Sequence, residues 1–186
     1  MRKLLLLVCL CAGVLSGKAQ VEEKYGLGKV PVVNGRVMFQ DTIIVALDDN
    51  LIYEKMSVWA KKRFNKPNVI VSRFVSEDVV NYQLGVTAEE WIDFKKKFFV
   101  WDRTRINYWV EFQCHNHLCV VRLTRINYWY EEERDGGLKF SAEEWITDAN
   151  AFNSHQTKLL KEPGKFRKKT IDFFEQIVQQ LSQTLQ

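Results

Sequence analysis

Alternating apolar and polar positions predict β-strands along the first two thirds of the chain. The clearest alternation runs from 37 to 47, where the large apolar residues share one parity, namely Val37, Phe39, Ile43, Val45 and Leu47. That pattern predicts a strand with one buried face. An Asn-Gly pair at 34–35 predicts a tight hairpin turn before it. The segments 69–75 and 79–86 are rich in β-branched residues and predict two further strands joined by a turn.

Two segments show helical spacing instead. The first, from 51 to 65, follows N-cap candidates at 48–50 and ends before Pro67, which disfavours helix in the residue before it. The second lies near the C-terminus, where apolar residues recur three and four apart, at Ile171, Phe174, Val178, Leu181 and Leu185. This spacing predicts an amphipathic helix over 171–185. We expect Pro163-Gly164 to interrupt the chain before that helix.

Two tetrapeptides carry the signature of a helix N-cap, a Thr or Ser followed three positions later by Glu. They are Thr87–Glu90 and Ser141–Glu144. The first predicts a short helix that carries Trp91, and the second predicts another helix start. The segment 98–101 is compatible with either a continuation of the first helix or a strand.

The hexapeptide Thr-Arg-Ile-Asn-Tyr-Trp occurs twice, at 104–109 and 124–129. A two-residue turn at Asn116-His117, between the copies, predicts a long hairpin. In the register set by this turn Cys114 faces Cys119, apolar residues face apolar residues, and acid faces base, which supports the pairing.

The same register predicts two cation–π contacts, which pair Arg105 with Tyr128 and Arg125 with Tyr108. It also contains a conflict, because a regular hairpin would place Ile106 and Ile126 on opposite faces. We therefore expect a bulge near residues 124–125, which would return the second copy to the face of the first.

Composition excludes several classes of protein. The chain has 186 residues, of which 46% are hydrophobic, 27% charged and 13% aromatic, with 9 Gly and 3 Pro. A collagen-like, low-complexity or disordered chain has a different composition. At this length a single domain buries about 70% of its unfolded surface. We predict one α+β domain over residues 30–186, with an antiparallel sheet covered by helices and a loose polar lead-in at 20–29.

The first 19 residues are predicted to be a secretory signal peptide. Arg2 and Lys3 precede the apolar run Leu4–Leu15, and small residues at 17 and 19 suit the cleavage site. The run is shorter than the roughly 20 residues that span a bilayer, so we expect no transmembrane anchor in the mature chain. We expect the mature protein in the periplasm or associated with the outer membrane.

Cleavage changes the charge of the protein. The full chain has a formal net charge of +4, with 27 Lys and Arg against 23 Asp and Glu. The signal peptide contains three basic residues and no acid, so the mature chain has a net charge of +1. A nearly neutral protein has no general attraction to nucleic acid, and we expect no nucleic-acid partner.

Several short motifs together resemble a known family. They are Pro31–Val37, Asp102–Tyr108, Thr124–Ile126, Tyr130–Arg134, Ala142–Asp148 and Gly164–Asp172. The chain resembles a family of exported proteins from Gram-negative gut anaerobes that carry a domain of unknown function with a TATA-binding-protein-like fold. The resemblance covers most of residues 30–175 and implies a curved antiparallel sheet with helices packed on one face. It implies no activity, and the name of the fold does not imply DNA binding.

Cys114 and Cys119 are the only cysteines that remain after cleavage. Their opposition beside a tight turn and the expected oxidising compartment favour a disulfide, with free thiols as the second interpretation. Zinc binding through these cysteines with His115 and His117 ranks third, because alternating strand residues point to opposite faces. We predict no metal and no cofactor.

Four aromatic residues of the repeat are candidates for ligand binding, Tyr108, Trp109, Tyr128 and Trp129. They could form a platform for sugars or a peptide, although such residues are more often core and cross-strand pairs. The binding interpretation gains if Trp109 and Trp129 lie together on a solvent-facing side of the sheet. A basic run at 158–169 is compatible with contact to anionic envelope components, but a solvated face balanced by Glu131–Glu133 is favoured.

The sequence contains none of the common local motifs of hydrolases, metalloproteases or nucleotide-binding enzymes. We therefore predict a non-enzymatic exported module that binds or scaffolds a polysaccharide, peptide or protein of the cell envelope. The alternative is an envelope hydrolase whose site is assembled in space. That alternative would need a pocket with His117 or His155 beside a carboxylate and a hydroxyl.

Overall fold

The computed structural model describes residues 21–97 and 100–186, so the predicted signal peptide lies outside the described residues. The elements in chain order are η1 (Glu23–Tyr25), β1 (Val32–Val33), β2 (Arg36–Ile44), α1 (Asp49–Arg63), β3 (Val69–Asp78), β4 (Gln83–Lys97), β5 (Val100–His115), β6 (Leu118–Tyr130), β7 (Leu138–Ser141), α2 (Ala142–Trp145), α3 (Asp148–Ala151) and α4 (Lys161–Leu185).

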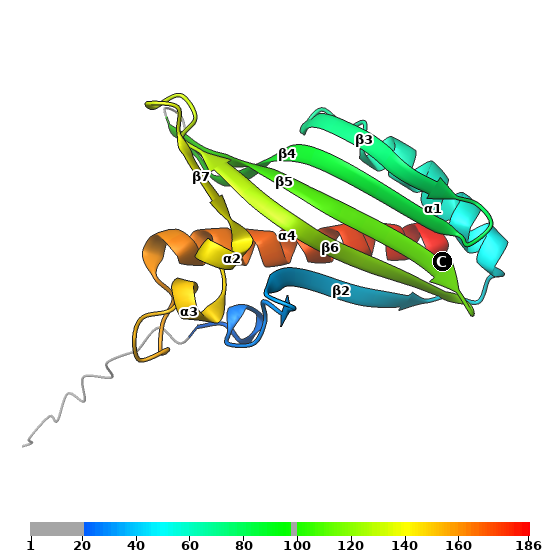
Figure 1. The fold of residues 1–186 in the computed structure, drawn as a ribbon, viewed down its shortest axis with the longest axis horizontal. Coiled ribbons are helices and arrows are strands. Elements are labelled where there is room, and N and C mark those ends of the chain that lie inside the picture. The colour runs from blue at the N-terminus through cyan, green and yellow to red at the C-terminus, as the bar shows by residue number, and fades with distance from the viewer. Residues whose placement is uncertain (1–20, 98–99) are drawn as a thin grey trace, which may run out of the picture.

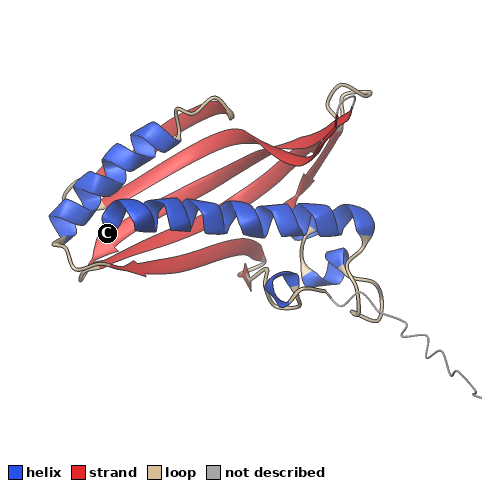
Figure 2. Cartoon of the chain, turned by 180° about the vertical axis from the view of Figure 1, so that it is seen from behind, coloured by secondary structure: helices blue, strands red, loops and turns tan. Residues whose placement is uncertain are grey.

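The strands form one antiparallel sheet in the order β1-β2-β6-β5-β4-β3, with β7 paired to the far end of β6. The long helix α4 and the shorter α1 lie on the same face of this sheet, and Figure 2 shows both helices in front of the strands. Figure 1 shows the opposite side, where neither helix covers the strands. We call these the covered face and the open face.

The core lies between the covered face and the two helices. Every second residue of β5 points into it, and the buried aromatic rings pack on the apolar stripe of α4. The ring centroids of Tyr108 and Phe173 are 5.2 Å apart, and those of Phe39 and Phe174 are 5.5 Å apart. The α+β class, the helix-covered antiparallel sheet and the apolar stripe of the C-terminal helix are therefore confirmed.

The long hairpin has the predicted register near its turn. Cys114 faces Cys119, and Glu111 faces Arg122, with 3.6 Å between the charged atoms of the latter pair. The predicted bulge is also present, because the register shifts after Asn107 and Arg125 has a left-handed φ of 54°. Ile106 and Ile126 are accordingly both buried on the covered face.

The bulge makes the two predicted cation–π pairs wrong. Beyond it, Arg105 faces Trp129 rather than Tyr128. The guanidinium of Arg125 lies over the ring of Trp109, with 5.2 Å to its centroid, rather than over Tyr108. The prediction carried the regular register past the bulge, where every pairing moves by one residue.

The helix predicted from Thr87–Glu90 does not form, since β4 runs through these residues. The Glu90 carboxylate is fully buried on the covered face. It accepts hydrogen bonds from Arg63 of α1 (3.0 Å), from Asn68 (2.7 Å) and from the hydroxyl of Tyr108. These distant partners outweigh the local cap signal.

The second N-cap prediction is confirmed. The backbone N–H of Glu144 donates to Ser141 Oγ at 3.3 Å, and the N–H of Ser141 donates to the Glu144 carboxylate at 2.9 Å. Here the chain has just left the sheet edge at β7, so no neighbouring strand competes for these groups.

Three predicted boundaries differ in the structure. β2 ends at Ile44 rather than near 47. The turn between β3 and β4 lies at 79–82 rather than 76–78, because the Asp78 carboxylate accepts N–H groups from the next residues. α4 begins ten residues early, at Lys161, and contains Pro163 in its first turn, where no backbone donor is needed.

The predicted lead-in is not loose in its described part. The Lys24 ammonium contacts the carboxylates of Asp172 and Glu175 on α4, at 2.7 and 2.6 Å. The hydroxyl of Tyr25 donates to Asp172 at 2.8 Å, and the Arg167 guanidinium donates to backbone carbonyls of the same segment. The segment therefore packs against the start of the long helix.

Candidate functional site

The structure divides the four aromatic candidates between the two faces of the sheet. Trp109 and Trp129 are half-buried on the open face. Tyr108 and Tyr128 are 1% and 2% exposed on the covered face. Adjacent residues of a strand point to opposite sides, so the expectation of one four-residue platform is corrected to two indoles on the open face.

The two tyrosines belong to the core. The Tyr108 hydroxyl donates to the buried Glu90, and burial, with the neighbouring carboxylate, raises the pKa of this phenol well above its usual value. The Tyr128 hydroxyl is 2.6 Å from Thr170 Oγ1 on α4, and burial likewise raises its pKa. Both side chains are neutral hydrogen-bonding groups that join the sheet to its helices.

A row of alternating aromatic and cationic side chains crosses the open face. Four strands contribute one residue each, in direct register, in the order Trp91, Arg105, Trp129 and Lys139. The Arg105 guanidinium is 5.1 Å from the ring centroid of Trp91 and 4.8 Å from that of Trp129. The Lys139 ammonium is 4.2 Å from the Trp129 centroid. We call these four residues the indole–cation row.

Acidic side chains fix the centre of the row. The Arg105 guanidinium forms ion pairs with Glu89, at 2.9 Å, and with Glu132, at 2.6 Å. Beside the row, Arg103 lies 3.7 Å from the ring centroid of Trp91 and 4.1 Å from that of Trp101. Cation–π contacts of this kind hold the indoles in place on a face that no helix covers.

The next row along the strands is polar and lies beneath a hollow. Its members, again in direct register, are Glu89, Asn107, Asn127 and Ser141. The hollow above it measures about 570 Å³ and is walled by residues of the indole–cation row. A second hollow of about 400 Å³ lies on the other side of Trp129. Both volumes fall in the range of about 300–1,000 Å³ that small-molecule sites have.

Glycines set the positions of both indoles. A Cβ atom on Gly85 would lie 2.8 Å from the ring of Trp109, so the indole rests on the bare backbone of β4. The indole N–H of Trp129 donates to the carbonyl of Gly136 at 2.9 Å. The sequence alone did not indicate either contact, because Gly85 lies on a neighbouring strand and Gly136 in the loop between β6 and β7.

The two cysteines lie on the covered face as buried free thiols, with 3.7 Å between their Sγ atoms. The disulfide between Cys114 and Cys119 stays a prediction. His115 and His117 are exposed and do not converge with the cysteines. Within residues 21–97 and 100–186, no group of three His, Cys, Asp or Glu side chains is placed to hold a metal ion.

The basic run at 158–169 is only partly a surface feature, since Lys158 and Lys161 are exposed. The Arg167 side chain is fully buried and pairs with Asp148 at 2.8 Å. The Lys165 ammonium contacts Asp102 at 3.1 Å and Glu162 at 2.7 Å. These acids, rather than the predicted Glu131–Glu133, pair with Lys165 and Arg167.

A separate hollow of about 430 Å³ at the end of the sheet contains His117, together with Asp49 and Tyr82. The two Asp49 oxygens accept the backbone N–H groups of Asn116 and His117, both at 2.9 Å. The hydrogen bond from the His117 N–H, together with that from Asn116, lowers the pKa of the Asp49 carboxyl below its usual value. The carboxylate thus ties the hairpin turn to α1, and the His117 ring instead contacts the carbonyl of Leu47 at 2.7 Å.

Among the described residues, no helix combines the length and the apolarity that crossing a bilayer requires.

The fold and this face define a class of protein, an α+β protein whose antiparallel sheet has helices on one face and a TBP-like arrangement. A family model described as a domain of unknown function (DUF4468) with TBP-like fold matches residues 39–129. A crystal structure of a DUF4468 family protein from Bacteroides ovatus is 33% identical, covers 87% of this chain and 93% of that chain, and has a TM-score of 0.79. The chain belongs to the DUF4468 family.

A second solved structure shows the same fold at lower identity. It is a TBP-like protein from Parabacteroides distasonis, 23% identical, with 84% of this chain and 96% of that chain covered and a TM-score of 0.67. No curated protein matches the chain. The predicted family, as a domain of unknown function with TBP-like fold, and the predicted fold class are therefore confirmed.

Proposed function

We propose that the protein is an exported, non-enzymatic module that binds or scaffolds a component of the bacterial cell envelope through the open face of its sheet. The indole–cation row is the observation that carries this proposal. Trp and Arg are the residue types most enriched at binding hot spots. Here they form an ordered row on a helix-free face, beside two hollows of small-molecule size.

Export is supported by the basic, apolar and small-residue segments at 1–19. Intact-mass measurement of the protein purified from its native cells, with fractionation of the envelope, tests this part. We expect a mature chain that starts at Gln20 and is found outside the cytoplasm. A full-length chain in the cytoplasmic fraction would contradict export and a role in the cell envelope.

Binding is tested by retention of envelope extract on immobilised mature protein. We expect Trp129→Ala to weaken retention of the bound component by roughly 30-fold, since hot-spot residues contribute about 2 kcal/mol or more. The matched control is Val58→Ala, a substitution of an exposed residue on α1, far from the open face. Circular dichroism checks that both variants are folded. Equal retention by the two variants would contradict the proposal.

The hydrolase alternative has one observation in its favour, the hollow that contains His117 beside Asp49 and Tyr82. Because backbone N–H groups engage both oxygens of the carboxylate, it does not orient the imidazole as a general base would require. His155, the other candidate, is exposed on a loop. Turnover of ester or glycoside substrates that is lost in His117→Ala would establish the alternative.

A further inference from the structure

The repeated hexapeptide gives the open face a local two-fold symmetry. The two copies lie side by side on antiparallel strands, and the bulge brings Asn107 opposite Asn127. In one direction from this pair Arg105 contacts Trp129, and in the other direction Arg125 contacts Trp109. An axis normal to the sheet, between the two asparagines, therefore relates one Arg–Trp contact to the other.

The indoles follow the same symmetry. Trp109 leans outward from β5 onto Gly85 of β4. Trp129 leans from β6 toward the carbonyl of Gly136, in the loop between β6 and β7. The asparagine pair lies between two half-sites. One contains Trp129 with Arg105 and Lys139, and the other contains Trp109 with Arg125.

Each half-site contains one cation with no acidic partner. In the first, Glu89 and Glu132 neutralise Arg105, but no described carboxylate lies within 4 Å of Lys139. In the second, Arg125 is exposed and also forms no ion pair within residues 21–97 and 100–186. Lys139 lies opposite Trp129, and positions 125 and 129 are four positions apart along β6, about 13 Å at the rise of a strand.

We infer that the open face binds an anionic polysaccharide, whose acidic groups reach the two unpaired cations while its hydroxyls meet the asparagine amides between them. This inference rests on the proposed function and names its ligand class. The surface presents an indole and an unpaired cation on each side of the asparagine pair, although the axis does not relate the two cations, Lys139 and Arg125. It thus suits a polymer of repeated units.

A peptide fits this surface less well. An extended peptide binds most readily by adding a strand at a sheet edge, where backbone groups are unpaired. On the open face β5 is already paired with β4 and β6, so only side chains are offered to a ligand. A polymer with hydroxyl groups along its whole length matches such a surface.

Single-stranded nucleic acid fits less well for a different reason. Its bases stack on the free faces of aromatic rings. Trp109 lies between the backbone of Gly85 and the guanidinium of Arg125. Trp129 lies between its register neighbours Arg105 and Lys139. Cations therefore already lie against both indole rings.

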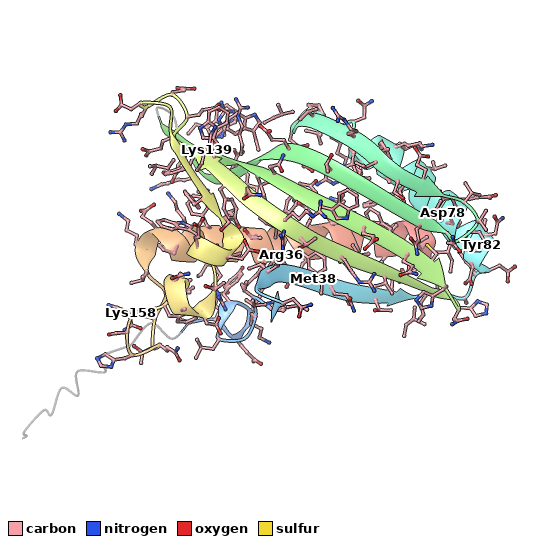
Figure 3. All side chains as sticks on the ribbon, in the orientation of Figure 1. Arg36, Met38, Asp78, Tyr82, Lys139 and Lys158 are labelled. Carbon is pink, nitrogen blue, oxygen red and sulfur yellow. The ribbon has the colours of Figure 1, made fainter. Side chains whose placement is uncertain are left out.

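The experiment uses the mature chain with polygalacturonate and with the same polymer fully methyl-esterified, measured by calorimetry at low and high salt. We expect binding of the acidic polymer alone, weakened by salt through screening of its charges. Lys139→Ala and Arg125→Ala should each weaken binding by about tenfold, and the double variant by roughly a hundredfold. Lys158→Ala is the matched control, because it removes one positive charge from an exposed loop distant from Lys139 (Figure 3).

The outcomes separate this inference from the proposed function. Equal binding of the esterified polymer, or no binding of polygalacturonate, overturns the anionic polysaccharide. Preferred binding of poly-glutamate or oligo-deoxythymidine that still depends on Lys139 and Arg125 also overturns it, but leaves the open face as the binding surface. Retention of an envelope component that Trp129→Ala does not change overturns the proposed function itself.

Discussion

The covered and open faces are built from alternate residues of the same strands, yet their polar groups are treated differently. On the covered face, Glu90 is fully buried, and Arg63 and Tyr108 satisfy its carboxylate. On the open face, the adjacent Glu89 is half-exposed and pairs with Arg105, while other cations have no acidic partner. Burial demands that charges be matched within the chain, whereas a solvated face can keep charges available for a ligand.

This contrast predicts that neighbouring acids differ greatly in their effect on stability. Glu90→Ala leaves the Arg63 guanidinium buried without its partner, and we expect it to lower the free energy of unfolding by about 3–5 kcal/mol. Glu89→Ala removes a partly exposed pair, and about 0–1 kcal/mol is expected. Urea denaturation of the two variants measures the difference. Similar losses would remove the distinction between the faces.

The redox state of the cysteine pair on the covered face is a further prediction. In an oxidising compartment we expect Cys114 and Cys119 to form a disulfide, whose short loop would stabilise the protein by about 2 kcal/mol. Thiol titration of denatured native material, with and without reductant, counts the pair. Two thiols without reductant would show that the pair stays reduced, and Cys114→Ala would then change stability equally under both conditions.

The smallest expected effect on stability concerns the open face. Gly85→Ala places a methyl group against the Trp109 ring, so the indole must move while the core is untouched. We expect a loss of less than about 1 kcal/mol, with a clear shift of one indole N–H signal in the NMR spectrum. Val80→Ala, in the exposed turn between β3 and β4, is the control. An unmoved indole signal in Gly85→Ala would show that the contact is not tight.

Much of the fold follows from local patterns. The apolar spacing of the C-terminal helix and the register of the long hairpin are properties of contiguous segments, and the structure confirms both. The bulge followed from a conflict between the two copies of the repeat. The helix predicted at Thr87–Glu90 does not form, because the cap signature is local while the partners of Glu90 come from α1 and β5. The apolar alternation of Leu84, Val86, Ala88 and Ile92 could have indicated the strand.

The candidate site was only partly predictable. Trp109 and Trp129 follow from the repeat, and both lie on the open face, but they lie on opposite sides of the asparagine pair rather than together. Trp91 and Lys139 were missed as members of the row, because they come from strands whose register with the hairpin no short motif encodes. The two tyrosines do not belong to the binding surface, because strand alternation within the repeat places them on the opposite side from the tryptophans.

The left-handed residue in β6 has an arithmetic origin. A hairpin closed by a two-residue turn pairs odd-numbered residues with even-numbered ones. The two copies of the repeat are offset by 20 positions, so an odd-numbered residue of one copy corresponds to an odd-numbered residue of the other. One inserted residue reconciles the two counts, and Arg125 is that residue. Its deletion would turn the distal half of the strand over, sending Asn127 toward the helices and Tyr128 into water.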